Sequence, residues 1–222
     1  MNSGDFVSIN YVGRIKDTGE IFDLTYEDIA KKEDVFDQKV KYGPVTIIVD
    51  GKFLLKSLND AIKEMKVGEK KKIELTPDKA FGDRNPELIK LIPEAKFKEQ
   101  NIDVYPGAVV TVNRLQGKVL SIDGGRVRVD FNHPLAGKTL EYEIEIVGEI
   151  KDNVEKIKSV IFYFVGIEKE DVEIKLSEKE VEMEFKKKYD LHSQTKSLIA
   201  STITQWIAGI ETVKFVDIYK KE

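Results

Sequence analysis

Residues 11–23 read YVGRIKDTGEIFD, and this stretch decides the predicted fold of the N-terminal part. From Phe6 to Val12 the sequence alternates with period two, because Val7, Ile9 and Tyr11 fall on one side of an extended chain. Such alternation is typical of a β-strand. Residues 16–20, KDTGE, are predicted to reverse the chain as a hairpin turn.

Further elements are predicted on the C-terminal side of this hairpin. Val45–Val49 and Lys70–Leu75 read as short strands. Between them, Leu54–Met65 carries apolar residues at helical spacing and is predicted to form one amphipathic helix. Leu140–Val147 is predicted to be the last strand of this part, with its even-numbered apolar residues on one face.

Residues 85–131 show a different pattern. A proline-containing segment is followed by a predicted strand at Ala108–Val112. Lys118–Ile122 and Val127–Phe131 flank Asp123-Gly124-Gly125, which is a hairpin signal. We therefore expect a small β-rich unit inserted into a larger β-rich domain.

A domain boundary is predicted near Ile150-Lys151, because all six prolines and 13 of the 15 glycines precede it. The remaining 72 residues are predicted to form a compact α+β unit. Its expected elements are a helix-like stretch at 154–159, a buried strand at 160–165, a hairpin of strands 172–176 and 181–185, a helix at 195–207 and a strand at 213–218.

Composition excludes several classes of protein. The chain has 222 residues, 36 Lys+Arg, 40 Asp+Glu and no Cys, which excludes disulfides, thiolate metal sites and cysteine nucleophiles. A net charge of −4 with interspersed signs argues against a nucleic-acid binder. The longest apolar run, Val160–Ile167, has eight residues and is too short to span a membrane. Met1–Asp5 lacks the pattern of a signal peptide, and we expect a cytoplasmic protein.

No covalent or metal chemistry is indicated. His133 and His192 lie 59 residues apart, without a carboxylate cluster at ligand spacing. The sequence has no phosphate-binding glycine loop, no nucleophile elbow and no HExxH motif. If the protein is an enzyme, it is expected to work without a strong nucleophile, a metal or another cofactor.

Five motifs in register give a more specific indication. In chain order they are Tyr11-Val12-Gly13, Gly19–Asp23, the helix Leu54–Met65, Met65–Lys70 and Ala80-Phe81-Gly82. Together they resemble an FKBP-type peptidyl-prolyl cis/trans isomerase. The resemblance implies an α+β fold, in which an antiparallel half-barrel surrounds one short helix.

Residues 131–138, FNHPLAGK, resemble the returning loop of the SlyD-like branch, which carries a small insert-in-flap chaperone domain at this point. The C-terminal unit is similar to that of long archaeal members. The resemblance implies an isomerase domain at 1–84 and 132–150, an insert at 85–131 and a C-terminal domain at 151–222.

The resemblance also implies the site residues. Three are expected to be catalytic: Tyr11, Phe22 and Asp23. Six more are expected to bind substrate around an apolar pocket: Val45, Leu54, Leu55, Leu58, Phe81 and Tyr142. The alternative is that Tyr11 and Phe22 are strand core and that Asp23 is a turn residue. Leu58 and Phe81 stand where the family often has a Trp and a Tyr.

The expected substrates are unfolded or partly folded polypeptides with X–Pro bonds. Seven apolar insert residues are expected to bind such clients: Leu88, Ile89, Leu91, Ile92, Phe97, Val104 and Tyr105. The alternative is that they form the core of the insert. Two competing functions stay open: a non-catalytic holdase, and an adaptor that docks through the C-terminal unit. The apolar stretch 160–165 also suggests a homodimer.

Overall fold

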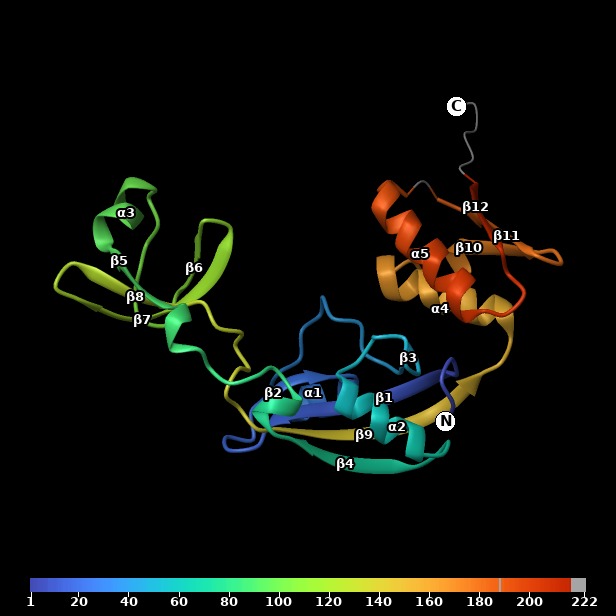
Figure 1. The fold of residues 1–222 in the computed structure, drawn as a ribbon, viewed down its shortest axis with the longest axis horizontal. Coiled ribbons are helices and arrows are strands. Elements are labelled where there is room, and N and C mark those ends of the chain that lie inside the picture. The colour runs from blue at the N-terminus through green and yellow to red at the C-terminus, as the bar shows by residue number, and fades with distance from the viewer. Residues whose placement is uncertain (188, 217–222) are drawn as a thin grey trace. The chain divides into compact units, whose positions relative to one another are not determined.

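The computed structural model describes residues 1–187 and 189–216 (Figure 1). By its internal contacts the chain divides into two compact units. One contains Met1–Arg14, Glu20–Ile73 and the described residues from Glu141 onward. The other contains Ile15–Gly19 and Glu74–Leu140. The domain boundaries expected from the sequence stay predictions.

The main sheet has five strands in the order β2-β1-β9-β4, and β3 pairs with β1 off this path. Pairing of β1 with both β2 and β3 is antiparallel. The strand bounds are β1 Phe6–Ile15, β2 Ile21–Leu24, β3 Val45–Ile48, β4 Lys70–Leu75 and β9 Leu140–Ile150. This arrangement confirms the α+β fold class and the strands expected in this part.

Helix α2 (Lys56–Glu64) crosses the main sheet and buries Leu58 and Ile62 (Figure 1). Its apolar spacing explains why it forms, because one face packs inward while the other stays polar. A short helix not expected from the sequence, α1 (Glu27–Lys32), follows β2 and buries only Ala30. A helix of six residues has few periodic positions to reveal it. The 3₁₀ turn η1 covers Pro77–Lys79.

The insert is a four-stranded antiparallel sheet in the order β5-β8-β7-β6, whose strands are labelled in Figure 1. Its core contains Phe97, Val110, Val119, Val127 and Val129. The bounds of its elements are η2 Pro86–Leu88, β5 Ile89–Pro93, α3 Glu94–Glu99, β6 Val109–Val112, β7 Leu115–Asp123 and β8 Arg126–Asp130. The predicted hairpin at Asp123-Gly124-Gly125 joins β7 to β8, whereas β5 and α3 had not been expected.

Polar side chains join the two connections that enter and leave this sheet. The Asn85 backbone N–H donates to Asn132 Oδ1 at 2.8 Å, and Asn132 Nδ2 donates to the Asn85 carbonyl at 2.9 Å. Arg84 Nε donates to Asp130 Oδ2 at 2.9 Å. These hydrogen bonds therefore join the segment that enters the insert to the segment that leaves it, at the start of residues 131–138.

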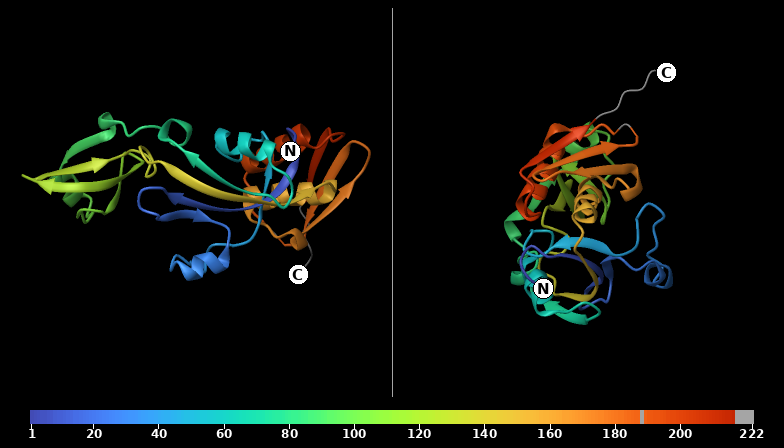
Figure 2. Two further views of the ribbon diagram at one scale, coloured as in Figure 1. Left: turned by 90° about the horizontal axis from the view of Figure 1, so that it is seen from below. Right: turned by 90° about the vertical axis from the view of Figure 1, so that its right-hand side faces the viewer.

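The C-terminal segment contains a three-stranded sheet, β10-β11-β12, against which helices α4 and α5 pack (Figures 1 and 2). Pairing is antiparallel for β10 with β11 and parallel for β11 with β12. The bounds are α4 Asn153–Val165, η3 Lys169–Asp171, β10 Val172–Leu176, β11 Glu180–Phe185, α5 Ser193–Trp206 and β12 Thr212–Val216. Residues 217–218 of the predicted last strand lie outside the described residues.

The prediction of a strand at 160–165 is wrong, because helix α4 continues through these residues. Asp152 caps the helix by accepting a hydrogen bond from the Glu155 N–H, and Gly166 ends it in the left-handed conformation. Ile157, Val160 and Ile161 are buried at helical spacing. Tertiary burial of this face outweighs the strand preference of β-branched residues.

Candidate active site

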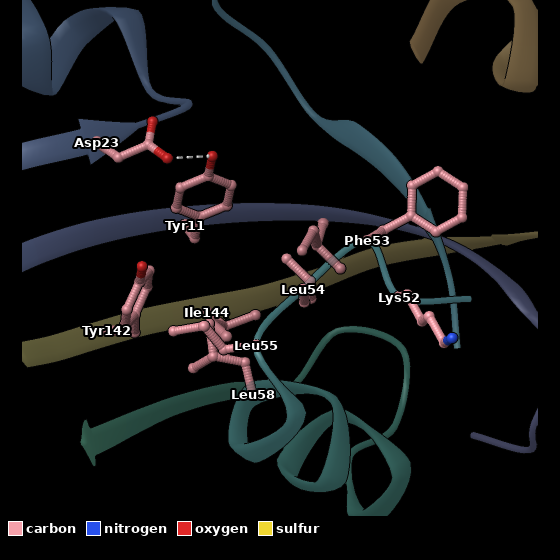
Figure 3. Close-up of a pocket in the computed structure, with 10 residues that line it drawn as sticks. Tyr11, Asp23, Lys52, Phe53, Leu54, Leu55, Leu58, Tyr142 and Ile144 are labelled. Atoms are coloured by element: carbon pink, nitrogen blue, oxygen red, sulfur yellow. Dashed lines mark hydrogen bonds between the residues drawn. The ribbon is translucent and has the colours of Figure 1, made fainter. Parts of the chain in front are cut away.

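An open cavity of about 410 Å³ lies between the main sheet and helix α2 (Figure 3). Strands β1 and β9 supply one wall, and the loop before α2 and the helix itself supply another. The lining residues are Ile9, Tyr11, Asp23, Lys52, Phe53, Leu54, Leu55, Leu58, Tyr142 and Ile144. Most of these side chains are apolar, and the cavity has the size of a small-ligand site.

Tyr11 and Asp23 form the polar part of the cavity. The Tyr11 hydroxyl donates a hydrogen bond of 2.8 Å to Asp23 Oδ2 (Figure 3). Asp23 stands opposite Gly13 in the β1–β2 register. The carboxylate is exposed. The pair therefore places one oriented acceptor at the edge of an otherwise apolar space.

The backbone beside Tyr11 is fixed by Thr25, which is buried. The Tyr11 N–H donates to Thr25 Oγ1 at 2.9 Å, and the Thr25 N–H donates to the Tyr11 carbonyl at 3.0 Å. The Thr25 hydroxyl in turn donates to Asn10 Oδ1 at 2.8 Å. Buried polar groups satisfied in this way hold the strand, and with it the tyrosine, in one position.

Burial raises the pKa of the Tyr11 phenol far above its ordinary value, and the Asp23 carboxylate adds to the effect through its charge and its hydrogen bond. Burial, with a smaller contribution from the Asp23 charge, also raises the pKa of Tyr142 to about 12. Both phenols are therefore neutral at physiological pH. They can donate hydrogen bonds but do not act as bases.

Six of the nine pocket residues expected from the sequence line the cavity: Tyr11, Asp23, Leu54, Leu55, Leu58 and Tyr142. Phe22 does not line it but packs edge-on against Tyr142, with ring centroids 5.5 Å apart. Val45 pairs with Ile9 in the sheet. Phe81 belongs to the other compact unit, where it stacks on His133 at 4.1 Å.

Four lining residues were not predicted: Ile9, Lys52, Phe53 and Ile144. Ile9 and Ile144 carried a signal, because each lies two residues from a predicted tyrosine on the same strand face. Lys52 and Phe53 carried none, since they belong to an irregular loop. Lys52 has a backbone φ of 63°, a conformation that sequence patterns do not reveal for a non-glycine residue.

The seven predicted client-binding residues fall into three groups. Leu88, Leu91 and Tyr105 are exposed. Ile89, Ile92 and Val104 are partly buried. Phe97 is 2% exposed and belongs to the core of the insert. Val109, which was not predicted to bind clients, is 69% exposed.

Within residues 1–187 and 189–216, no cluster of three His, Asp or Glu side chains is placed to hold a metal ion. In the same described part of the chain, no helix combines the length and apolar character needed to cross a membrane.

A half-open apolar cavity with one oriented carboxylate suits a neutral group of low polarity. Comparisons with known proteins show which family the chain resembles. Residues 90–135 match the family described as "FKBP26, IF domain", and residues 153–220 match the one described as "FKBP26_C-terminal". A short-type peptidyl-prolyl cis-trans isomerase of Methanocaldococcus jannaschii is 29% identical over 146 residues, which cover 66% of this chain and 92% of the relative.

A probable FKBP-type 16 kDa peptidyl-prolyl cis-trans isomerase of Pseudomonas fluorescens is 37% identical over 119 residues, 51% of this chain and 78% of the relative. The FKBP-type isomerase SlyD of Helicobacter pylori is 27% identical over 119 residues, 52% of this chain and 64% of the relative. The chain therefore belongs to the family of FKBP-type peptidyl-prolyl cis/trans isomerases. This result confirms the resemblance and the enzyme class expected from the sequence.

Proposed function

We propose that the protein accelerates cis/trans isomerisation of X–Pro bonds in polypeptides at the cavity that contains Tyr11 and Asp23. The observation that carries this proposal is the combination of apolar walls with one oriented carboxylate. Leu54, Leu55 and Leu58 supply those walls and suit a pyrrolidine ring.

The chemistry needs no nucleophile and no cofactor. Amide resonance sets a rotation barrier of about 18–20 kcal/mol, and the group loses resonance and polarity as it twists. An apolar cavity favours the twisted state over the planar one. The neutral Tyr11 phenol keeps Asp23 in place, so that the carboxylate faces the twisting group without reorganising. Each 1.4 kcal/mol of such preference is worth about tenfold in rate.

Turnover of a short X–Pro peptide tests this proposal, with Asp23→Ala compared with wild type. The matched control is Asp28→Ala, which removes another exposed carboxylate, on α1. We expect kcat/KM to fall about tenfold or more for Asp23→Ala, because a charge-assisted interaction is lost, and to change little for Asp28→Ala. Equal turnover by both variants and wild type would overturn the proposed role of this site.

We further propose that the insert binds unfolded segments of the same substrates. Leu91 is 60% exposed in β5 and Val109 is 69% exposed in β6, at the two edges of the sheet. The strand register places both on the face opposite the buried Val127 and Val129. Large exposed apolar side chains on one face are typical of an interaction surface.

Basic side chains lie between these two edges. Leu91 pairs with Arg128 in β8, and Val109 pairs with Lys118 in β7. The face thus combines apolar and cationic groups, which suits an extended chain of mixed sequence. If one segment of a polypeptide is held on this face, the prolines in its other segments are present at the cavity at a raised effective concentration.

Suppression of aggregation tests this second proposal. We expect the double variant Leu91→Ser/Val109→Ser to suppress aggregation of an unfolded protein several-fold less well than wild type, while its turnover of a short peptide is unchanged. Leu198→Ser, at an exposed leucine of α5, is the control. Undiminished suppression by the double variant would exclude this face as the binding surface.

Homodimerisation and a cytoplasmic location stay predictions. The stretch 160–165, on which the dimer was predicted, is part of helix α4, and its Val160 and Ile161 are buried within the chain. Sedimentation of the full chain tests the assembly.

The adaptor alternative makes a different prediction. Deletion of residues 151–222 should then abolish the association of the protein with its cellular complex, without affecting its turnover of a short peptide.

A further inference from the structure

One residue that lines the cavity is in contact with the C-terminal segment. Phe53 lines the cavity from the loop before α2. Its ring centroid lies 4.4 Å from that of Tyr163 in α4, at an interplanar angle of 72°. The ring centroid of Phe164 lies 6.4 Å from that of Phe53. Two aromatic rings of α4 therefore lie around Phe53, the one of the three rings that lines the cavity.

The end of α4 is held beside the cavity by packing. Phe6 and Ile48 of the main sheet belong to one buried cluster with Val160 and Ile161 of the helix. Side chains of β1, β3, Phe53 and α4 meet in this contact, and they leave no space for a water molecule between them. Both sides belong to the same compact unit. Tyr163 is thus positioned by a closely packed core.

A second attachment comes from the segment before β3. Lys41 Nζ lies 5.2 Å from the centroid of the Phe162 ring and forms an ion pair with Glu168. The end of α4 is therefore fixed by contacts on both of its flanks. A side chain on a rigid element keeps its geometry better than one on a loop.

Tyr163 nevertheless remains 49% exposed, whereas Ile161 is buried and Phe164 is half-buried. Tyr163 therefore presents exposed ring surface beside Phe53. In Figure 3, Phe53 is at the opposite end of the cavity from Asp23.

We propose that Phe53 and Tyr163 form an aromatic subsite that binds a bulky apolar side chain flanking the substrate proline. The subsite deepens the proposed isomerase function and rests on it. A side chain from the C-terminal segment would then set part of the substrate preference of the isomerase. Two rings in edge-on contact offer faces and edges for a third, which is the arrangement that aromatic groups prefer.

The test uses the full chain and peptides that differ only in the residue before or after proline, which is Phe, Leu or Ala. Tyr163→Ser is compared with Tyr163→Phe, which keeps the ring, and with Leu198→Ser, a control at an exposed leucine of α5. We expect Tyr163→Ser to lower kcat/KM about threefold to tenfold for the Phe peptides. The Ala peptides should change less than about twofold, and Tyr163→Phe should behave as wild type.

Dissociation constants of the same peptides, measured by calorimetry, separate this inference from the isomerase proposal. An unchanged Phe-to-Ala preference in Tyr163→Ser, while wild type is active, would overturn the subsite and leave the isomerase. An equal loss for all peptides would also overturn it. Binding with the expected preference but without turnover would support the subsite and refute the proposed reaction.

Discussion

The Tyr11 hydroxyl and the Asp23 carboxylate are joined by a 2.8 Å hydrogen bond that links β1 to β2 at the edge of the cavity. The two residues are twelve positions apart in the sequence. The hairpin between them brings the pair together, with Asp23 opposite Gly13. The bond gives the Tyr11 hydroxyl a hydrogen-bond acceptor and orients the Asp23 carboxylate at the same time.

Because the two groups share this bond, we predict that their substitutions are not additive. Tyr11→Phe should lower kcat/KM about threefold to tenfold, because Asp23 loses the donor that orients it. Tyr11→Phe should then lower kcat/KM less in the Asp23→Ala variant than in wild type. Peptide turnover by the two single variants and the double variant measures this coupling. Full additivity would show that the bond has no part in catalysis.

The raised pKa of Tyr142 predicts a loss of stability in alkali. Burial and, to a lesser extent, the Asp23 charge raise this pKa from 10.0 to about 12 in the folded protein. The unfolded chain therefore releases the proton first as the pH rises. The stability contributed by the neutral phenol is complete below pH 10 and is lost between pH 10 and about 12.

Denaturant unfolding of wild type and Tyr142→Phe, at about pH 9 and about pH 11, measures this contribution. The free energy of unfolding should fall more steeply for wild type, because Phe has no proton to release. Other titrating groups affect both proteins equally and cancel in the comparison. Parallel curves would contradict the assignment to Tyr142.

Gly13 leaves room for the aromatic pair behind the cavity. A Cβ atom at this position would lie 2.7 Å from Phe22 Cζ and 3.1 Å from Tyr142 Cε1. We predict that Gly13→Ala lowers the free energy of unfolding by about 1–3 kcal/mol and also reduces turnover, because both rings must move. Gly148→Ala in β9 is the matched control, since its Cβ would meet nothing within 4 Å. If both variants unfold like wild type, the packing at Gly13 is looser than the structure indicates.

Phe97 and Leu91 were predicted to share one role, but their burial predicts opposite behaviour. Phe97→Ala should destabilise the insert by about 3–5 kcal/mol, because it leaves a cavity in the core. Leu91→Ser should change stability by about 0.5 kcal/mol or less. Hydrogen exchange of the β7 and β8 amides measures both effects. Equal protection in the two variants would contradict the proposed division into core and client-binding surface.

Regular elements were predictable where one local pattern dominates. Strand β4 was predicted at 70–75 and is found at those residues. Helix α2 was predicted within about two residues at its N-terminal end, because its apolar spacing fits only a helix. Helix α4 was missed in part, because β-branched composition was given more weight than the spacing of Ile157, Val160 and Ile161.

The candidate site was predictable through its strand residues and less so through its loops. Tyr11, Asp23 and Tyr142 lie on or next to the motif of residues 11–23 and the alternating strand β9. Phe53 is in a loop whose conformation no periodic pattern describes. Its proposed role depends on Tyr163, which lies 110 residues away and contacts it only in the folded protein.

The sequence by itself determined the family, the α+β class and the core of the cavity, because those features follow from local periodicity, turn residues and motifs in register. Only the tertiary structure decided which apolar side chains stay exposed on the insert, and that Tyr163 stands beside Phe53. The physical reason is that burial and contact between distant segments depend on how complete faces pack. Residues such as Leu91 and Phe97 look alike in sequence, and only packing separates them.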